Sequence, residues 1–361
     1  MMIAPNSGNV QGIVLAGVHA WGESLLEEIC CRPLLPVLGR PLVWHVLDWL
    51  ARGGISRASI CANSDTGIFK GCLGTGRVAG VELNYYADLM PRGPAGCMRD
   101  AADKSTADIF VVVDGSIVTG IDLAELVAAH RWNHAELTVV VAEKAGTTAS
   151  EPTGIYVVSR AALDQVPDKG YQDIKEMLIP RLYEQGQRVA AYSVPAGAVL
   201  RVTSAASYLS VVAWALQAAP CLPGRYNRIG QALVHASSYI ARSARLIGPA
   251  IIGPGCVLDE AATVLGPTCV GPDCTLGRGA VVSRTTMWPA CRIGKEAFVD
   301  HSVLTSGSTV EAGLVVRDTV WMPRRSETAP LPARGLYWAM AEQPEITRHL
   351  HDIDLPVRMG R

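Results

Sequence analysis

The pattern of apolar positions changes partway along the 361-residue chain. Before residue 219, short aliphatic runs typical of buried strands alternate with stretches in which apolar residues recur at helical spacing. Runs such as GIVLAG (12–17), IFVVVDG (109–115) and GIYVVS (154–159) are almost continuously apolar. Strands of this kind, separated by helices, predict a parallel-rich α/β sheet that is covered on both faces and binds ligands beyond the carboxyl ends of its strands.

Later in the chain the period becomes six. Every sixth residue from Ile252 to Val282 is aliphatic, and the residue four places after each of them is small. A six-residue period with an aliphatic corner predicts a parallel β-helix, in which successive coils stack like side chains on one another. The pattern continues less regularly to about Trp321. The aliphatic positions are Ile252, Leu258, Val264, Val270, Leu276 and Val282, and the small ones are Cys256, Ala262, Thr268, Cys274, Ala280 and Thr286.

These two patterns divide the chain into five parts. Residues 1–9 form an N-terminal extension, 10–218 the α/β domain, 219–228 a proline-containing linker, 229–322 the β-helix and 323–361 a tail. The tail has two interpretations. It packs on its own β-helix or is partly disordered, or it docks a partner chain.

Composition narrows the classes of function. The net charge is −1, and Lys and Arg form no long stripe, which argues against nucleic acid or anionic lipid as a partner. No uncharged apolar run reaches the length of a membrane span, and the start of the chain lacks a signal-peptide pattern, so we expect a cytoplasmic protein. The ten cysteines form no C-x-x-C pair and indicate reduced thiols. Zinc binding by Cys269 and Cys274 is the alternative, but the six-residue repeat already accounts for both.

The order of the two domains, together with LAG (15–17) and RPLLPVLGRPLVWHVLDWL (32–50), resembles the sugar-1-phosphate nucleotidyltransferases that carry a C-terminal hexapeptide domain. RGPAG (92–96) resembles the nucleobase loop of that family, and GIYVVS (154–159) another of its landmarks. The resemblance implies a Rossmann-like, GT-A-like nucleotidyltransferase domain followed by a left-handed parallel β-helix. It also implies nucleotide binding by Leu15, Ala16, Gly17, Arg32, Gly93, Pro94, Ala95, Gly96 and Asp114, and sugar binding by Gly154.

The family signature itself has changed. Members of the family join a nucleoside triphosphate to a sugar 1-phosphate and release pyrophosphate, a step that depends on cations around the phosphates. Here Gly22 stands where the signature has arginine, Trp21 replaces its threonine, and Arg32 alone keeps a positive charge. His19 also lies in this loop, and negative charge is added by Glu23, Glu27 and Glu28.

Both metal-binding aspartates of the family are also replaced. Ser116 stands at the first position, with Asp114 two residues earlier, and Arg201 stands at the second. A fixed arginine repels a cation, so the sequence predicts no metal site, and Mg²⁺ only if Asp114 takes over the missing contact. Glu143-Lys144 is either a remnant of the family's sugar-phosphate motif or a solvent-exposed strand end.

Three hypotheses for function follow. The first is a degenerate nucleotidyltransferase that serves as a regulatory, sensing or scaffold subunit and still holds a nucleotide or sugar nucleotide. The second is an active sugar-1-phosphate nucleotidyltransferase that uses Arg32, Asp114 and Lys144. The third is an acyltransferase of the hexapeptide class with His235 or His301 as base, although His301 is more simply a coil-surface residue. Because β-helix coils leave open ends and flat faces, we expect a homo-oligomer or a complex with an active paralogue.

Overall fold

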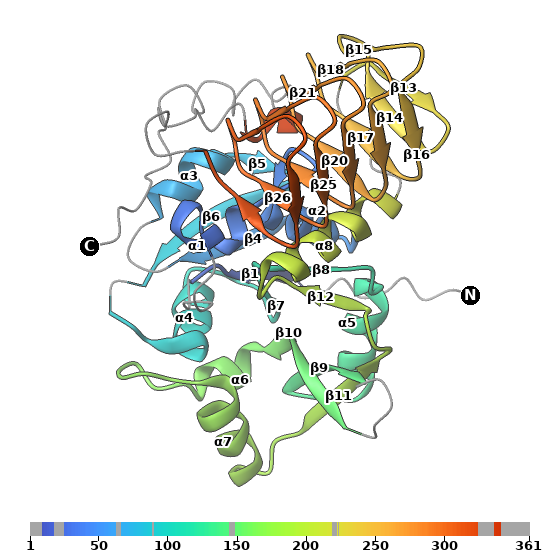
Figure 1. The fold of residues 1–361 in the computed structure, drawn as a ribbon. Helices are drawn as coiled ribbons and strands as arrows, with labels where there is room; N and C mark the ends of the chain where they lie inside the picture. The colour runs from blue at the N-terminus through green and yellow to red at the C-terminus, as the bar shows by residue number, and fades with distance from the viewer. Residues whose placement is uncertain are drawn as a thin grey trace. The chain divides into compact units, whose positions relative to one another are not determined.

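A computed structural model of the chain describes residues 9–17, 25–62, 66–88, 90–143, 149–218, 222, 224–323 and 336–340. The chain divides into two compact units (Figure 1). The first unit is built from the described residues within Met1–His19 and Leu42–Leu200, and the second from those within Ala20–Pro41 and Arg201–Arg361. The second unit therefore contains the β-helix together with a short segment from near the start of the chain.

The first unit is built on an eight-stranded sheet in the order β11-β9-β10-β7-β1-β4-β6-β5. The central strands β7, β1, β4 and β6 are parallel, whereas β10 runs antiparallel to both of its neighbours and β5 to β6. The predicted parallel-rich α/β sheet is thus confirmed. Its strands are β1 (Val10–Leu15), β4 (Arg57–Ala62), β5 (Arg77–Val78), β6 (Val81–Ala87), β7 (Ile109–Asp114), β9 (Leu137–Glu143), β10 (Ser150–Ser159) and β11 (Val189–Val194).

Helices follow the strands as the apolar spacing predicts. The α4 helix packs on β1 and β4, and its Met98 joins Ile13 and Phe110 in the core. The α5 helix starts at Asp122, whose carboxylate accepts the N–H groups of the first turn. The helices are α2 (Leu42–Arg52), α3 (Gly67–Leu73), α4 (Gly93–Ala102), α5 (Leu123–Trp132), α6 (Arg160–Asp164), the π-helix η2 (Ile174–Leu178) and α7 (Ile179–Glu184), and a small second sheet pairs β8 (Ile117–Thr119) with β12 (Val199–Arg201).

The second unit contains the predicted β-helix, whose parallel repeats are consistent with the left-handed form (Figure 1). Every aliphatic and small position of the six-residue pattern is at most 3% exposed, because these side chains fill the interior of the coils. Three sheets form its sides: β13 (Tyr226–Ile229), β14 (Ala232–His235), β17 (Ala250–Ile252), β20 (Thr268–Val270), β23 (Thr286–Met287), β26 (Val303–Leu304) and β29 (Val320–Trp321); β15 (Tyr239–Ile240), β18 (Val257–Leu258), β21 (Thr275–Leu276), β24 (Arg292–Ile293) and β27 (Thr309–Val310); β16 (Arg245–Ile247), β19 (Thr263–Leu265), β22 (Val281–Ser283), β25 (Phe298–Asp300) and β28 (Val315–Arg317).

The coils shorten by one residue partway along the β-helix. Ala250 pairs with Thr268, eighteen residues later, whereas Cys269 pairs with Thr286, only seventeen residues later. The later coils keep the shorter length, as the pairing of Val281 with Phe298 shows. This missing residue is the reason why the six-residue pattern becomes irregular after Val282.

Glycines at the coil corners allow the backbones of neighbouring coils to approach each other. A Cβ atom added to Gly294 would lie 2.5 Å from the backbone nitrogen of Ala312 in the next coil. At Gly271 the added Cβ would lie 2.9 Å from the carbonyl oxygen of Met287. Both distances are too short for a real side chain, so these corners require glycine.

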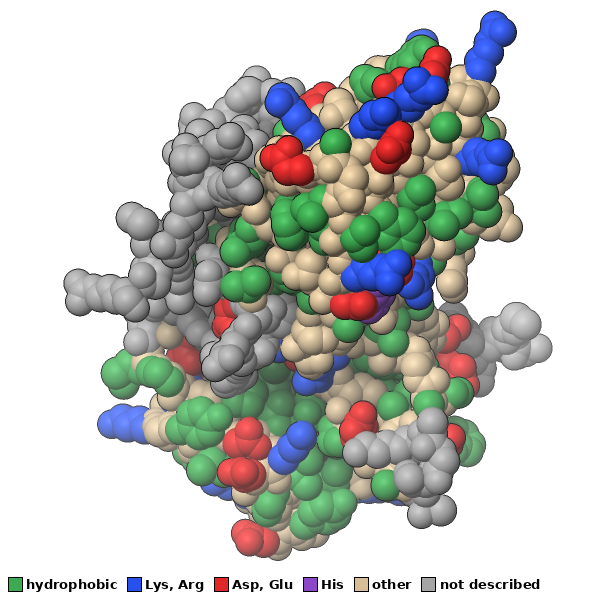
Figure 2. Space-filling model, viewed as in Figure 1, with side chains coloured by type: hydrophobic (Ala, Val, Ile, Leu, Met, Phe, Trp, Pro, Cys, Tyr) green, Lys and Arg blue, Asp and Glu red, His purple; other side chains and the backbone are tan. Residues whose placement is uncertain are grey.

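On the face of the β-helix seen in Figure 2, basic and acidic side chains are interspersed. Arg284 and Asp300, on neighbouring coils of the β-helix, form an ion pair. None of the helices in the described part of the chain is long and apolar enough to cross a membrane.

Elements from outside the β-helix complete the second unit. The β2–β3 hairpin turns through Leu38 and Gly39, both with positive φ, as a two-residue turn of this kind requires. These elements are α1 (Leu25–Ile29), the 3₁₀ helix η1 (Arg32–Leu34), β2 (Pro36–Val37), β3 (Arg40–Pro41), α8 (Ala205–Gln217) and the 3₁₀ helix η3 (Trp338–Met340). Within the predicted tail, residues 336–340 therefore pack on their own chain.

Candidate functional site

The carboxyl edge of the central strands brings several of the predicted site residues together. Leu15 at the end of β1 lies beside Asp114 at the end of β7. The backbone of this edge is already hydrogen-bonded, because the Ala16 N–H donates to Cys61 and the Leu15 carbonyl accepts from Gly115. Gly17, the next residue, is exposed. Within the predicted LAG segment, Gly17 is therefore the residue most accessible to a ligand at this edge.

Asp114 and Ser116 form a compact turn at the end of β7. The Ser116 N–H and the Ser116 hydroxyl both donate to Oδ1 of Asp114, at 2.8 and 2.6 Å. Ser116 itself is buried. The serine that the resemblance aligns with the family's metal position thus occupies an oxygen of Asp114, the carboxylate predicted to replace the missing aspartate.

Gly154 lies in an irregular part of β10 that approaches the same edge. Ile155, the next residue, pairs with Val113 of β7, so Gly154 comes just beyond the paired residues, at the end of β7 where Asp114 lies. The register between β10 and β9 shifts across this stretch, and Gly154 has φ +87°. The Thr153 hydroxyl supports the irregularity by donating to the Val140 carbonyl and accepting the Ile155 N–H. The structure therefore unites the predicted sugar-binding glycine with Asp114.

The GPAG loop forms the first turn of α4, but its backbone is used internally. The Ala95 N–H donates to the Gln172 carbonyl at 3.0 Å, and Pro94 has no N–H to offer. Gly93 has φ +72°, and a Cβ atom there would lie 2.6 Å from the Gln172 oxygen. The close approach of Gln172 thus explains why position 93 needs glycine. The same residue also takes up the Ala95 N–H, which a nucleobase could otherwise have used.

Arg92, immediately before this loop, is tied to other residues of the protein. Its guanidinium makes two hydrogen bonds of 3.0 Å to the Asp100 carboxylate and a third to the Pro167 carbonyl. Its backbone N–H donates to Asp88. Arg92 is 7% exposed, so this bidentate pair is largely shielded from water. The arginine beside the loop therefore anchors α4.

Sequence reasoning missed the partners of this network, Asp88, Asp100 and Gln172. Asp88 directly follows the strand β6 at the carboxyl edge of the sheet, so the rule that ligands bind beyond strand ends could have identified it. Asp100 and Gln172 gave no such signal, because their roles depend on contacts with Arg92 and Ala95.

Protonated thiol and phenol groups surround these carboxylates. Burial, followed by the nearby Asp88 and Asp100 charges, raises the pKa of the Cys61 thiol. Burial also raises the pKa of Cys97, whose thiol donates to Asp88, and that of Tyr86, whose hydroxyl donates to Asp100. These groups therefore act as hydrogen-bond donors at neutral pH and are poor nucleophiles.

Three buried polar atoms near the start of α4 lack a hydrogen-bond partner among the described residues. They are Asp88 Oδ1, Arg92 Nη1 and Gln172 Oε1. Buried polar atoms in native proteins are usually satisfied, so such exceptions often indicate a place where water or a polar ligand binds. Asp88 Oδ1 and Gln172 Oε1 are hydrogen-bond acceptors, and Arg92 Nη1 is a donor.

Two further candidates belong to the second unit, and others lie outside the described residues. Arg32 opens η1 and Arg201 ends β12, and both belong to the second unit. Outside the described residues lie Lys144 and the loop positions His19, Trp21, Gly22 and Glu23. The side chain of Glu28 is also outside them, whereas Glu27 lies in α1.

The described residues do not fit the magnesium site of the family. They contain no group of three or more His, Cys, Asp or Glu side chains that could hold a metal ion. At the strand edge, Ser116 supplies a hydroxyl in place of a carboxylate and binds Asp114 Oδ1. Magnesium sites are built around carboxylates, so Asp114 would need help from residues outside the described set.

The cysteines considered for zinc binding and the histidines considered for acyl transfer are engaged in the β-helix. Cys274 points into the coil and donates to the Trp288 carbonyl, and Cys269 is buried as well. His235 bonds to Ser237, and His301 forms a pair with the exposed Asp318 on the next coil.

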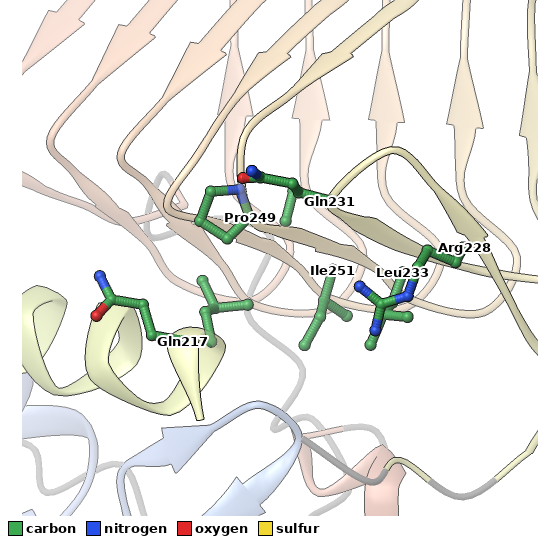
Figure 3. Close-up of a pocket in the computed structure, with 8 residues that line it drawn as sticks. Gln217, Arg228, Gln231, Leu233, Pro249 and Ile251 are labelled. Atoms are coloured by element: carbon green, nitrogen blue, oxygen red, sulfur yellow. The ribbon is translucent and has the colours of Figure 1, made fainter. Parts of the chain in front are cut away.

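One pocket of about 260 Å³ lies within the second unit, between the end of α8 and the first coils (Figure 3). Leu233 and Ile251 contribute apolar surface, and the exposed side chains of Gln217, Arg228 and Gln231 lie around them. None of the candidate site residues predicted from the sequence lines this pocket.

Comparison with known proteins supports the resemblance. The family described as "Nucleotidyl transferase" matches residues 28–151. The chain is 24% identical over 335 residues to a mannose-1-phosphate guanylyltransferase of Mycobacterium tuberculosis, an alignment that covers 85% of this chain and 83% of that protein. It is 22% identical over 129 residues to a D-glycero-alpha-D-manno-heptose 1-phosphate guanylyltransferase of Aneurinibacillus thermoaerophilus, covering 36% of this chain and 55% of that one.

Among solved structures, a glucose-1-phosphate thymidylyltransferase from Bacillus anthracis matches with a TM-score of 0.50 and 17% identity. The match covers 57% of this chain and 95% of the other and concerns the fold alone. The predicted family resemblance and fold class are thereby confirmed. Residues 28–151 thus match the nucleotidyl transferase family, a β-helix follows them, and over 85% of its length the chain is similar to a mannose-1-phosphate guanylyltransferase.

Proposed function

We propose that this chain is a catalytically degenerate relative of the sugar-1-phosphate guanylyltransferases, which binds a guanine nucleotide or a GDP-sugar and acts as a regulatory, sensing or scaffold subunit. The observation that carries the proposal is the Asp114–Ser116 turn. Where the family places a metal-binding carboxylate, this chain has a buried hydroxyl that donates to Asp114. We further propose the cytoplasm as its compartment, which suits cysteines held as thiols, such as Cys97 and Cys274.

The chemistry of the family explains why this turn matters. In nucleotidyl transfer an oxygen of the sugar phosphate attacks the α-phosphorus of the triphosphate, and the bond to pyrophosphate breaks. The protein contributes mainly by positioning the reactants and stabilising negative charge. Mg²⁺ would supply much of that charge stabilisation when bound, and two carboxylates normally hold it. Ser116 and Arg201 stand at those two positions in the sequence, and neither side chain is a carboxylate that could hold Mg²⁺.

Guanine is the base that we propose. Two of the relatives described above are guanylyltransferases by name. The buried atoms without partners near α4 supply acceptors at Asp88 and Gln172 and a donor at Arg92. A guanine edge offers N–H donors and a carbonyl acceptor, so it complements this set once the first turn of α4 opens to admit it.

The deciding experiment combines turnover with binding. The purified full chain is incubated with GTP, mannose 1-phosphate and Mg²⁺, and pyrophosphate is measured; UTP, dTTP and ATP serve as comparison nucleotides. We expect no pyrophosphate, but a rise in melting temperature with GTP or GDP-mannose. Pyrophosphate release above a no-enzyme control would contradict degeneracy, and an unchanged melting temperature with every nucleotide would leave only a scaffold role.

The second candidate is an active nucleotidyltransferase. It is favoured by the similarity to a guanylyltransferase over 85% of this chain. Catalysis would then use Arg32, Asp114 and Lys144. If pyrophosphate is released, Asp114→Asn should abolish it, whereas Ser193→Ala, on the exposed face of β11 in the same unit, should not.

We also propose that the chain works in an assembly, as a homo-oligomer or with an active paralogue, through its β-helix. Exposed apolar side chains on the coils support this, among them Tyr239, Ile247 and Val315. Light scattering after size exclusion should give a mass above that of one chain, and a monomer at micromolar concentration would refute self-association.

A further inference from the structure

The segment that carries Arg32 is held by residues from far along the chain. The Tyr337 hydroxyl donates to the Leu34 carbonyl at 2.5 Å, and Tyr337 is fully buried. Leu34 is the last residue of η1, which starts at Arg32. The last carbonyl groups of a helical turn lack partners within it, so Tyr337 closes the turn from outside.

A second buried tyrosine holds the same segment two residues later. The Tyr208 hydroxyl, on α8, donates to the Pro36 carbonyl and accepts the indole N–H of Trp288 from the β-helix at 3.2 Å. Tyr208 is fully buried too. All of these residues belong to the second unit, so the backbone of residues 34–36 is held within that unit.

The hairpin that follows is held by the neighbours of Tyr337. The indole ring of Trp338 lies against Gly39 so closely that a side chain there would overlap it. The Ala339 N–H donates to the Gly39 carbonyl at 3.0 Å. Residues Leu336–Met340, named here the C-terminal clamp, therefore contact both η1 and the β2–β3 hairpin.

We propose that the C-terminal clamp positions Arg32 for binding the phosphates of a nucleotide, with Tyr337 as the principal positioning residue. This inference rests on the proposed function. Arg32 is the one signature position that keeps a positive charge, and it is separated from the Tyr337 contact only by Pro33 and Leu34, both buried. Proline restricts φ at its own position, so a displacement at Leu34 is transmitted to Arg32 and not absorbed by the chain between them.

The test uses the full chain and a cycle of four proteins: wild type, Tyr337→Phe, Arg32→Gln and the double variant. Tyr337→Phe removes one hydroxyl and keeps the ring. Its matched control is Tyr183→Phe, on the exposed surface of α7. GTP affinity is measured by calorimetry, and hydrogen exchange is followed in peptides covering residues 30–41.

We expect Tyr337→Phe to speed exchange in residues 32–41 and to weaken GTP binding by about fivefold, the effect of one lost hydrogen bond. With Arg32→Gln already present, Tyr337→Phe should have no additional effect on affinity, because it acts through Arg32. Tyr183→Phe should change neither quantity. If Tyr337→Phe does not fold, Trp338→Phe is used in its place.

Equal GTP affinities of the wild type and Tyr337→Phe would overturn the inference, and so would additive losses in the double variant. A wild type that binds neither GTP nor GDP-mannose would defeat the proposed function and the role of the clamp in binding. That outcome is visible in the wild-type measurement alone. The exchange data then still show whether Tyr337 holds residues 32–41.

Discussion

Ser116 directs both its backbone N–H and its hydroxyl at the same oxygen of Asp114, at 2.8 and 2.6 Å. A carboxylate oxygen that accepts two such bonds is well satisfied without a cation. The turn at the end of β7 is therefore stable without a bound cation.

Ser116→Asp should restore a dependence on magnesium. The substitution removes the hydroxyl donor and places a second carboxylate beside Asp114, which together form the kind of oxygen pair that Mg²⁺ prefers. We expect the rise in melting temperature with GTP to increase when Mg²⁺ is added to Ser116→Asp, but not in the wild type. Ser116→Asn, which has the same shape without the charge, is the control. A magnesium effect of equal size in all three proteins would contradict this prediction.

The Arg92–Asp100 pair should be important for stability. Replacing Arg92 by Met leaves the largely shielded Asp100 without its bidentate partner, and breaking such a pair costs about 3–5 kcal/mol. Adding Asp100→Leu should recover much of that loss, since no charge then remains unpaired. Urea unfolding of the two single variants and the double variant measures the coupling. Strictly additive losses would show that the pair contributes little.

His130 should make stability depend on pH. It is 2% exposed, and burial, followed by the charge of Arg131, lowers its pKa to about 4. Between pH 6.5 and about 4 the unfolded chain binds a proton at this residue and the folded chain does not. Stability therefore falls as the pH is lowered through this window, by up to about 1.4 kcal/mol per pH unit, and the loss levels off below it.

Urea unfolding at several pH values measures this slope. His130→Asn should reduce it. Thr138→Val removes the hydroxyl 2.8 Å from the imidazole but keeps the histidine, so it should lower stability by about 1 kcal/mol and preserve the slope. An unchanged slope in His130→Asn would mean that other groups cause it.

Gly294→Ala should destabilise the β-helix. The new Cβ would meet the backbone of Ala312, which cannot move without opening the stack, and overpacking of this kind costs about 1–3 kcal/mol. Gly120→Ala is the control, since a Cβ there meets nothing within 4 Å and φ is not positive. Thermal unfolding of the two variants tests the contrast, and equal melting temperatures would refute it.

The fold could be predicted from the sequence because its main signals are local. The six-residue pattern identified the buried corners from Ile252 to Val282, since burial in a stacked coil repeats at a fixed spacing. The pattern could not reveal that later coils have seventeen residues. In the sequence, a coil that is one residue shorter cannot be distinguished from a repeat whose apolar positions are less regular.

The candidate site could be predicted only in part. The rule that ligands bind beyond strand ends placed the LAG segment at the carboxyl edge of the sheet, and Leu15 lies there beside Asp114. It could not show that the Ala95 N–H is used by the Gln172 carbonyl, 77 residues later, or that Arg92 is paired with Asp100. Such contacts depend on how distant segments pack, and no short motif records them.

The bond between Tyr337 and Leu34 spans 303 positions of the sequence. During synthesis, η1 emerges early, but its closing partner is made only after every coil of the β-helix. Contacts that close such long loops form late in folding. The Arg32 segment should therefore reach its final position among the last events of folding, once the β-helix is complete.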